Sequence, residues 1–255
     1  EGNLSITGAE LQNITATGLT IGKDTNDSIT IDNLTAANSA NISSKLELNT
    51  DKSITFANND SVFSSFGLNL NADSGVVLNQ NVTSAGTTTI DSDVDNNGTG
   101  NLTIAATKKL STGNSLLKIT ANDIDLSGKL DSGTASTEIL VSDDGTIGLG
   151  DTEGNLSITG AELQNIYADS LTIGSSSNGN IAVDNLYAAN SNNILTKLEL
   201  NSGGSIRFLN NDSTFNAFDL NVNANSGITF NQNVTSSGTT TIDSDVDNDG
   251  TGNFT

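Results

Sequence analysis

Short hydrophobic runs with a period of two recur along the whole chain. In Leu19-Thr-Ile21, Leu46-Glu-Leu48 and Leu102-Thr-Ile104, the outer two side chains point to one face and the middle one to the other. Gly, Asn, Asp and Ser, which favour turns, lie between the runs. Helical periodicity is absent, so the pattern predicts an all-β chain. Further runs of this kind are residues 4–6, 29–31, 54–56, 68–70, 76–78, 117–119, 124–126, 139–141 and 147–149.

The sequence repeats itself at a fixed offset. Residues 1–14 return letter for letter as 153–166, and the alignment then continues without a gap to residue 255. About seven in ten of the aligned positions are identical, which is typical of a tandem array. We therefore divide the chain into a first full period, 1–152, and a second, incomplete copy, 153–255. We expect one continuous structure rather than two separate domains, and we expect the chain to be a stretch of a longer repeat protein or polymer.

The length of the period favours a parallel β-solenoid. It divides into about seven segments of roughly 21–22 residues, and a segment of that length suits one turn that stacks on the next at about 4.8 Å. One period would then advance about 34 Å. A row of β-sandwiches or a propeller is the alternative. A sandwich would normally have longer strands and a larger aromatic core than two tyrosines and eight phenylalanines provide. Proline is absent, as expected where every interior strand needs its N–H groups for pairing.

Charge and composition restrict the function. The chain has 30 acidic and 9 basic residues, for a net charge of −21, and this field repels nucleic acid and attracts cations. Histidine and cysteine, the commonest general base, nucleophile and transition-metal ligands, are absent. No apolar run is long enough to cross a bilayer. We therefore expect neither an enzyme nor a nucleic-acid partner nor membrane insertion.

One acidic motif is a candidate for calcium. It matches the first half of a D-x-[DN]-x-[DN]-G loop, in which oxygen ligands on alternate residues converge and the glycine permits the tight turn. The glutamate that usually completes such a loop is missing, since Ile104 occupies its place. Two interpretations stay open: a weak calcium site, or an acidic turn whose carboxylates face water and whose inward residue is Val94. The candidate ligands are Asp93, Asp95 and Asn97 and, in the second copy, Asp245, Asp247 and Asp249.

Four other features have both a plain and a functional interpretation. Phe56, Phe63 and Phe66 recur as Phe208, Phe215 and Phe218, and we interpret them as core rather than as a ligand platform. Tyr167 and Tyr187 replace threonines of the first copy and form either an exposed stripe or simple repeat drift. Thr87-Thr-Thr89 is too isolated for an ice-binding array. The single arginine, Arg207, and the pair Asp143–Asp144 before Gly145 make a poor basis for polysaccharide cleavage, and we interpret the pair as a turn.

Several phrases resemble a known family. They are Gly-Ala-Glu-Leu-Gln-Asn-Ile at 8–14, Gly-Leu-Thr-Ile-Gly at 18–22, residues 34–42 and Thr-Ile-Asp-Ser-Asp-Val-Asp at 89–95. They look like the repeats of large filamentous-haemagglutinin-like surface proteins of bacteria. The resemblance implies a right-handed β-helical shaft, secretion, and a role in adhesion or in an extracellular fibre. It implies no catalytic residues.

Together these features favour a structural function. We expect the chain to form the shaft of an extracellular fibre or surface filament, such as one in a biofilm matrix. Its expected partners are copies of itself, joined end to end or laterally. The alternative is an adhesin region that itself binds a host receptor or a glycan at the cell surface.

Overall fold

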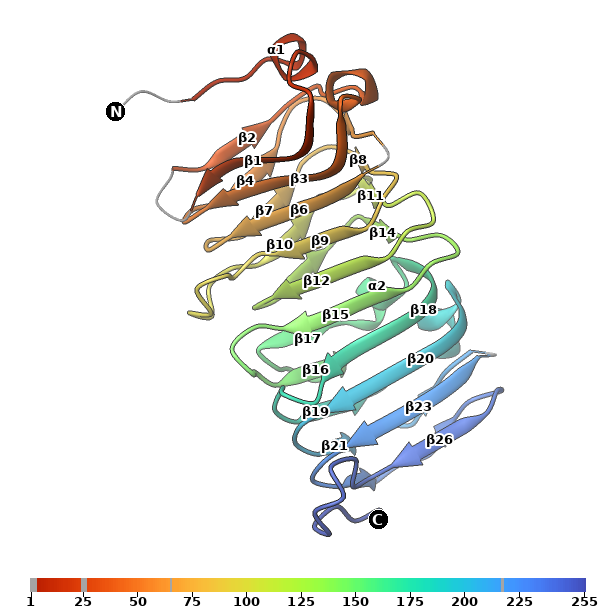
Figure 1. Cartoon of the computed structure of the whole chain (residues 1–255). Coiled ribbons are helices and arrows are strands. Elements are labelled where there is room, and N and C mark those ends of the chain that lie inside the picture. The colour runs from red at the N-terminus through yellow and green to blue at the C-terminus, as the bar shows by residue number, and fades with distance from the viewer. Residues whose placement is uncertain (1–3, 24–26, 65, 217) are drawn as a thin grey trace.

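Parallel β-strands dominate the computed structural model, which describes residues 4–23, 27–64, 66–216 and 218–255. Figure 1 shows the strands stacked in chain order from one end of the molecule to the other. The largest sheet has fourteen strands. Ten of them form a row that we call the main limb: β1 (Ala16–Lys23), β3 (Ile42–Thr50), β6 (Gly67–Ala72), β9 (Thr88–Asp91), β12 (Leu117–Ala121), β15 (Thr137–Val141), β18 (Ile166–Ser175), β20 (Ile194–Ser202), β23 (Asp219–Ala224) and β26 (Thr240–Asp243).

The remaining strands form a short limb and three smaller sheets. The short limb joins the main limb through β18 and contains β5 (Ser61–Val62), β8 (Val82–Thr83), β11 (Lys109–Ser111) and β14 (Lys129–Asp131). The second sheet contains β2 (Ile29–Ile31), β4 (Ile54–Phe56), β7 (Val76–Leu78), β10 (Leu102–Ile104) and β13 (Ile124–Leu126). The third contains β16 (Ile147–Gly150), β17 (Leu156–Ile158), β19 (Ile181–Asp184), β21 (Ile206–Phe208) and β24 (Ile228–Phe230), and β22 (Ser213–Thr214) pairs with β25 (Val234–Thr235). The all-β prediction is confirmed.

From β3 to β15 the chain visits the main limb, the second sheet and the short limb in strict rotation. It returns to the main limb at unequal intervals, which we call steps, so the predicted uniform spacing is wrong. The shortest steps run from β6 to β9, from β12 to β15 and from β23 to β26, and the longest runs from β15 to β18. Six steps, rather than seven segments, make up one period. The paired positions are Leu19↔Leu46, Leu46↔Leu68, Leu68↔Thr88, Thr88↔Leu117, Leu117↔Thr137 and Thr137↔Leu171.

Insertions account for the three long steps. The step between β1 and β3 contains the 3-10 helix η1 (Ala36–Ser39), and the step between β9 and β12 contains an acidic loop. The longest step, between β15 and β18, contains β16, β17 and the helix α2 (Gly160–Leu163). Strand pairing fixes only the spacing across the sheet, so a connection can lengthen without disturbing the ladder. A spacing averaged over the period therefore hides this irregularity.

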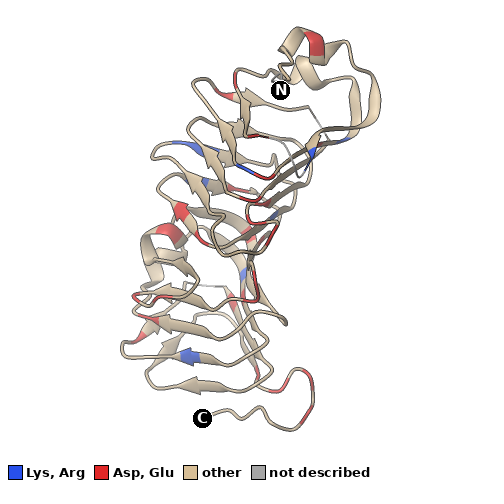
Figure 2. Cartoon of the chain, turned by 90° about the vertical axis from the view of Figure 1, so that its left-hand side faces the viewer, with Lys and Arg blue, Asp and Glu red and all other residues tan. Residues whose placement is uncertain are grey.

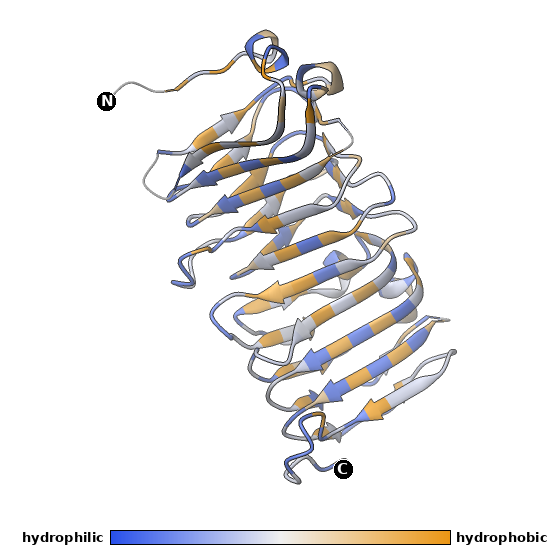
Figure 3. Ribbon diagram, in the orientation of Figure 1, coloured by the Kyte–Doolittle hydropathy of each residue, from blue (hydrophilic) through white to orange (hydrophobic). Residues whose placement is uncertain are grey.

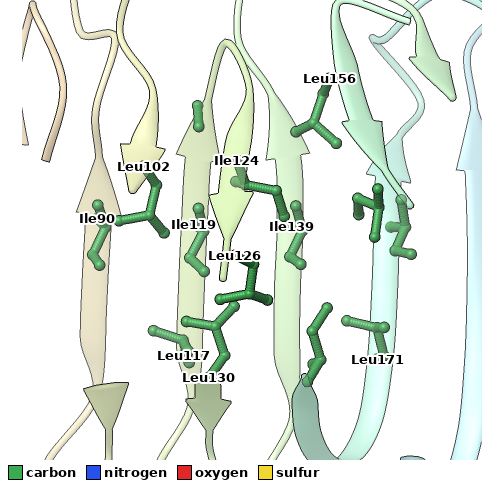
Figure 4. Packing of buried hydrophobic residues seen from close by; sticks show 14 of the residues in the cluster. Ile90, Leu102, Leu117, Ile119, Ile124, Leu126, Leu130, Ile139, Leu156 and Leu171 are labelled. Carbon is green, nitrogen blue, oxygen red and sulfur yellow. The ribbon is translucent and has the colours of Figure 1, made fainter. Parts of the chain in front are cut away.

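The hydrophobic runs meet in the interior. Along β6, Leu68 and Leu70 are fully buried while Asn69 and Asn71 are partly exposed, and Figure 3 shows this alternation on successive strands of the main limb. Figure 4 shows Ile119 of the main limb and Leu102 and Ile124 of the second sheet turned into the same space. Burial of these aliphatic side chains, at roughly 25 cal/mol per Å², is the main source of stability. The buried cluster includes residues of both copies, without a break at residue 153.

The phenylalanines belong to this core, as predicted. Phe56 and Phe63 pack edge to face with ring centroids 6.2 Å apart, and their counterparts Phe208 and Phe215 do so at 6.5 Å. All four rings are buried, as are those of Phe66 and Phe218. Hence the rings are part of the core and do not form a surface platform.

Short helices are the element that the periodicity missed. Besides η1 and α2, the structure contains α1 (Gly8–Gln12) and η2 (Ala188–Ser191). α1 and α2 begin with a capping box: the threonine hydroxyl accepts the Glu10 or Glu162 N–H, and the glutamate carboxylate accepts the threonine N–H in return. The spacing Thr7-x-x-Glu10 is a sequence signal for this arrangement. Helices this short cannot show a helical period.

Residues 4–6 are not a strand, although their exact copy is. Leu156 lies in β17, pairs with Ile147 of β16 and is fully buried, whereas Leu4 is 73 % exposed. A strand as short as β17 needs a neighbour for its backbone groups. The residues preceding the second copy provide that neighbour, so the same sequence adopts two structures.

Glu162→Ala is expected to lower the free energy of unfolding by about 1–2 kcal/mol, because two interactions are lost. Glu162 closes the α2 capping box, and its Oε1 also accepts the Leu126 N–H at 3.1 Å. Urea denaturation followed by circular dichroism measures the loss. Glu10→Ala is the matched control and should have a smaller effect, since Glu10 closes only its own box. Equal losses of unfolding free energy in the two variants would show that the hydrogen bond between Glu162 and Leu126 does not stabilise the fold.

Candidate cation-binding loops

Two loops of nearly the same sequence follow the carboxyl ends of two main-limb strands. We call residues 91–100, after β9, the first acidic loop, and residues 243–252, after β26, the second acidic loop (Figure 1). In each, the valine N–H bonds the neighbouring strand: Val94 to the Ala72 carbonyl and Val246 to the Ala224 carbonyl, both at 3.2 Å. The loops therefore have the same attachment to the sheet.

Left-handed residues give both loops the same curl. Asn96 has φ of 51° and Gly98 of 76°, and the corresponding Asn248 and Gly250 have 56° and 84°. Asparagine and glycine adopt this backbone region more readily than other residues. The Asn-x-Gly pattern in the motif therefore has a conformational reason, independent of any ligand.

The first aspartate of each candidate triplet is at the centre of its loop. Oδ2 of Asp93 accepts the Gly98 N–H at 3.1 Å, and Oδ2 of Asp245 accepts the Gly250 N–H at the same distance. Main-chain contacts of this kind hold the carboxylate in a fixed orientation. The position of the other carboxylate oxygen, Oδ1, follows from this anchoring.

The structure brings the three predicted ligands of the second loop together. Asp245, Asp247 and Asp249 each offer a carboxylate oxygen, and these oxygens all lie within 4.8 Å of one another. In the first loop Asn97 takes the place of Asp249, and its side-chain amide donates to Asp95 Oδ2 at 2.7 Å. Asn97 Oδ1 accepts the Thr99 hydroxyl, as Asp249 Oδ1 accepts the Thr251 hydroxyl.

The orientation of the first loop is the reverse of what an ordinary acidic turn would have. Asp93 is 0 % exposed and Val94 is 38 % exposed, so the aspartate is the inward residue and the expectation of an inward Val94 is wrong. Oδ1 of Asp93 is buried and accepts no hydrogen bond from the described residues, and the same holds for Oδ1 of Asp245. A buried carboxylate oxygen without a donor is costly, because it has lost its water.

A serine far away in the sequence covers the first loop. Ser142, directly after β15, donates its hydroxyl to Asp93 Oδ2 at 2.5 Å, and the neighbouring Asp143 N–H donates to Asn96 Oδ1 at 3.3 Å. Sequence reasoning missed this contact. Only the pairing of β9 with β12 and of β12 with β15 places residues 93 and 142 together.

Burial, hydrogen bonds and neighbouring charges shift the pKa values of carboxylates in the two loops. Burial raises the pKa of Asp91, the Asp93 N–H lowers it, and the negative charges of Asp93 and Asp73 raise it further. In the second loop the Thr251 hydroxyl and N–H lower the pKa of Asp249, which keeps that carboxylate charged. Figure 2 shows how few basic residues the chain has among its acidic ones.

The other candidate positions are not gathered into a site. Arg207 is exposed on β21, and Asp143 and Asp144 both have positive φ in a turn, as predicted. Lys129 lies over the Tyr167 ring at 4.8 Å from its centroid, while Tyr187 is 61 % exposed. The ring contacts of the described residues do not include a Tyr167–Tyr187 pair.

Comparison with known family models, curated proteins and solved structures finds no match to this chain. Within the described residues, no helix has the length and apolar character that crossing a membrane requires.

Proposed function

We propose that the chain is a stretch of a parallel β-solenoid and that it forms the shaft of an extracellular fibre. Each step between main-limb strands is one turn of variable length, and the solenoid is right-handed, in line with the filamentous-haemagglutinin-like resemblance. One observation carries the proposal. β18, in the second copy, pairs with β15 of the first, so the main limb runs from one period into the next without interruption.

The junction between the periods is built like the interior of each. Leu171 and Ile173 of β18 pair with Thr137 and Ile139, and the start of the same strand pairs with β14 through Leu130↔Ile166. Backbone ladders and a continuous core therefore join the copies. In such arrays stability is close to a sum of repeat and nearest-neighbour terms, so the shaft lengthens without changing its cross-section.

The first copy has the same surface available for a preceding period. Leu19 and Ile21 correspond to Leu171 and Ile173 of the second copy, yet they are only partly buried where their counterparts are fully so. Among the described strands, β1 is the last of its limb, and the outer edge of such a strand carries unpaired backbone groups. A strand with the sequence of β15 would fit this edge as β15 fits β18.

Six turns at about 4.8 Å give an axial repeat of about 29 Å per period. The test is electron microscopy of the native filaments, and of chains lengthened by one or two whole periods. We expect a meridional reflection at about 4.8 Å, and about 29 Å of added length per period at constant width. Particles whose width grows instead of their length would overturn the shaft. Antibody labelling of intact cells tests the extracellular location, and labelling only after lysis would exclude it.

Direct adhesion is the second candidate, because the second copy exposes apolar side chains that the first lacks. Tyr187 and Leu195, 61 % and 59 % exposed, replace Thr35 and Ser43. An exposed aromatic ring next to polar groups is suited to stacking on a sugar. Suppose that the wild-type chain binds glycans on an array. Loss of this binding in Tyr187→Thr, together with unchanged binding in the control variant Thr35→Ser, would favour this function. Equal binding by both variants would exclude Tyr187 as the contact.

Asp123→Asn is expected to stabilise the junction at neutral pH. Oδ1 of Asp123 accepts the Ser157 N–H at 2.8 Å, and an amide oxygen can do the same. Burial raises the pKa of Asp123, hydrogen bonds from the Ser157 and Ile124 N–H groups lower it, and the charges of Glu162 and Asp125 raise it. The folded state therefore binds this proton more tightly than the unfolded one, and wild-type stability falls as the pH rises from 3.8 through the raised pKa.

The stabilisation by Asp123→Asn should consequently be largest above that pKa and should vanish at pH values below 3.8. Urea denaturation over a series of pH values measures it. Asp27→Asn, which removes a charge from an exposed side chain, is the control for the loss of one negative charge. A gain in Asp123→Asn that is constant across the series would show that burial of the charge is not its cause.

A further inference from the structure

We propose that each acidic loop binds one calcium ion, through Asp93, Asp95 and Asn97 in the first loop and Asp245, Asp247 and Asp249 in the second. This inference is independent of the fibre function. It rests on two separate observations: an unpartnered buried oxygen, present in both loops, and the convergence of carboxylate oxygens, observed in the second loop.

The buried oxygen is Oδ1 of Asp93. The side chain is fully buried, Oδ2 is held by the Gly98 N–H and the Ser142 hydroxyl, and Oδ1 accepts nothing from the described residues. An ionised carboxylate oxygen can only accept, and a bound cation would satisfy it where no donor of the protein does. Asp245 repeats this arrangement, since its Oδ2 accepts the Gly250 N–H while its buried Oδ1 has no such partner among the described residues.

Convergence identifies the ligand class. Three carboxylate oxygens within 4.8 Å of one another repel each other, and a cation between them would relieve that repulsion. Calcium binds oxygen at about 2.3–2.6 Å, so two of its ligands can be separated by up to about 5.2 Å. Magnesium binds at about 2.0–2.1 Å, which allows only about 4.2 Å, and it demands octahedral geometry. The flexible coordination of calcium tolerates the irregular spacing of these three oxygens better than the octahedral coordination of magnesium does.

The two loops differ in one ligand. Asn97 of the first loop supplies a neutral amide where Asp249 of the second supplies a charge. Calcium affinity rises with the number of charged ligands and with the rigidity of the site. Ser142 and Asp143 hold the first loop from the β15 side. The second is the more charged. Exchanging the two side chains, by Asn97→Asp in the first loop and Asp249→Asn in the second, therefore tests the contribution of this charge.

The experiment is a calorimetric titration of CaCl₂ into the metal-stripped full chain. The wild type is expected to bind two ions. Asn97→Asp should tighten the first site roughly tenfold, and Asp249→Asn should weaken the second by a similar factor. Asp245→Asn should remove one ion from the stoichiometry. The exposed Asp27→Asn is the matched control for loss of one negative charge, and it should leave both sites unchanged.

Three results would overturn the proposal. They are the absence of saturable calcium binding in the wild type, equal affinities for MgCl₂ and CaCl₂, and an Asp249→Asn affinity no lower than that of Asp27→Asn. Folding is checked separately, by the circular dichroism of each variant without metal. Asp95→Asn, a change on an exposed side chain of the first loop, should remove the other ion from the stoichiometry.

Discussion

Phe56→Ala is expected to lower the free energy of unfolding by about 3–5 kcal/mol. The ring is fully buried in β4 and packs edge to face on Phe63, with 6.2 Å between centroids. β4 lies between β2 and β7, so the structure on both sides limits how far the cavity can collapse. Urea denaturation followed by circular dichroism in the β-sheet region measures the loss.

Phe208→Ala makes the same change in the second copy, where the ring also contacts Phe230 at 4.7 Å. Its cost should therefore be at least as large as that of Phe56→Ala. Tyr187→Ala is the control, an aromatic truncation at a site that is 61 % exposed, and should change stability by no more than about 0.5 kcal/mol. A loss in Phe56→Ala that merely equals the loss in Tyr187→Ala would refute the assignment of these rings to the core.

Gly100→Ala is expected to cost about 2–4 kcal/mol and to disrupt the first acidic loop. A Cβ at this position would lie 1.8 Å from the Ser92 carbonyl oxygen and 2.7 Å from the Asp93 Cα. Both are backbone atoms, which cannot move aside as the end of a side chain can. The loop must therefore open, and Asp93 would lose its buried position. Hydrogen exchange of residues 91–101, together with urea denaturation, measures the effect.

Gly18→Ala is the matched control for this change. Its nearest neighbour is the Lys45 carbonyl oxygen, 3.7 Å from the added Cβ, which is an ordinary contact. It should leave stability nearly unchanged, and it should leave the first loop protected. If Gly100→Ala proves equally harmless, then the tight approach of residues 92 and 100 does not hold the loop together.

Much of the fold could be predicted because the strands obey a local rule. Leu68, Leu70 and Ile119 alternate with polar residues, and each turns inward as the period of two requires. The lengths of the steps could not be predicted in this way. Pairing of Thr137 with Leu171, across the longest step, depends on where the insertions leave and rejoin the sheet. Leu4 and Leu156 make the point most clearly, since identical sequence forms a strand only where a neighbour is present.

The candidate site, too, could be predicted only in part. The spacing of Asp245, Asp247 and Asp249 predicted their convergence, because alternate residues of a curled chain face its centre. The inward orientation of the Asp93 side chain was not predictable from its neighbours, since hydrophobicity alone predicts that Val94 points inward. Nor could any local pattern have found Ser142, which contacts Asp93 only because two strand pairings bring it there.

The unequal steps have a consequence for how shafts meet one another. Each insertion occurs once in a period: a short helix after β1 and another before β18, and an acidic loop after β9. In a fibre the surface would thus carry a pattern of protrusions that recurs only every six turns, about every 29 Å. Two shafts lying side by side could interlock at whole periods and would clash at the turns between. The irregular connections would therefore fix the axial offset between neighbouring shafts in a bundle, which uniform turns could not do.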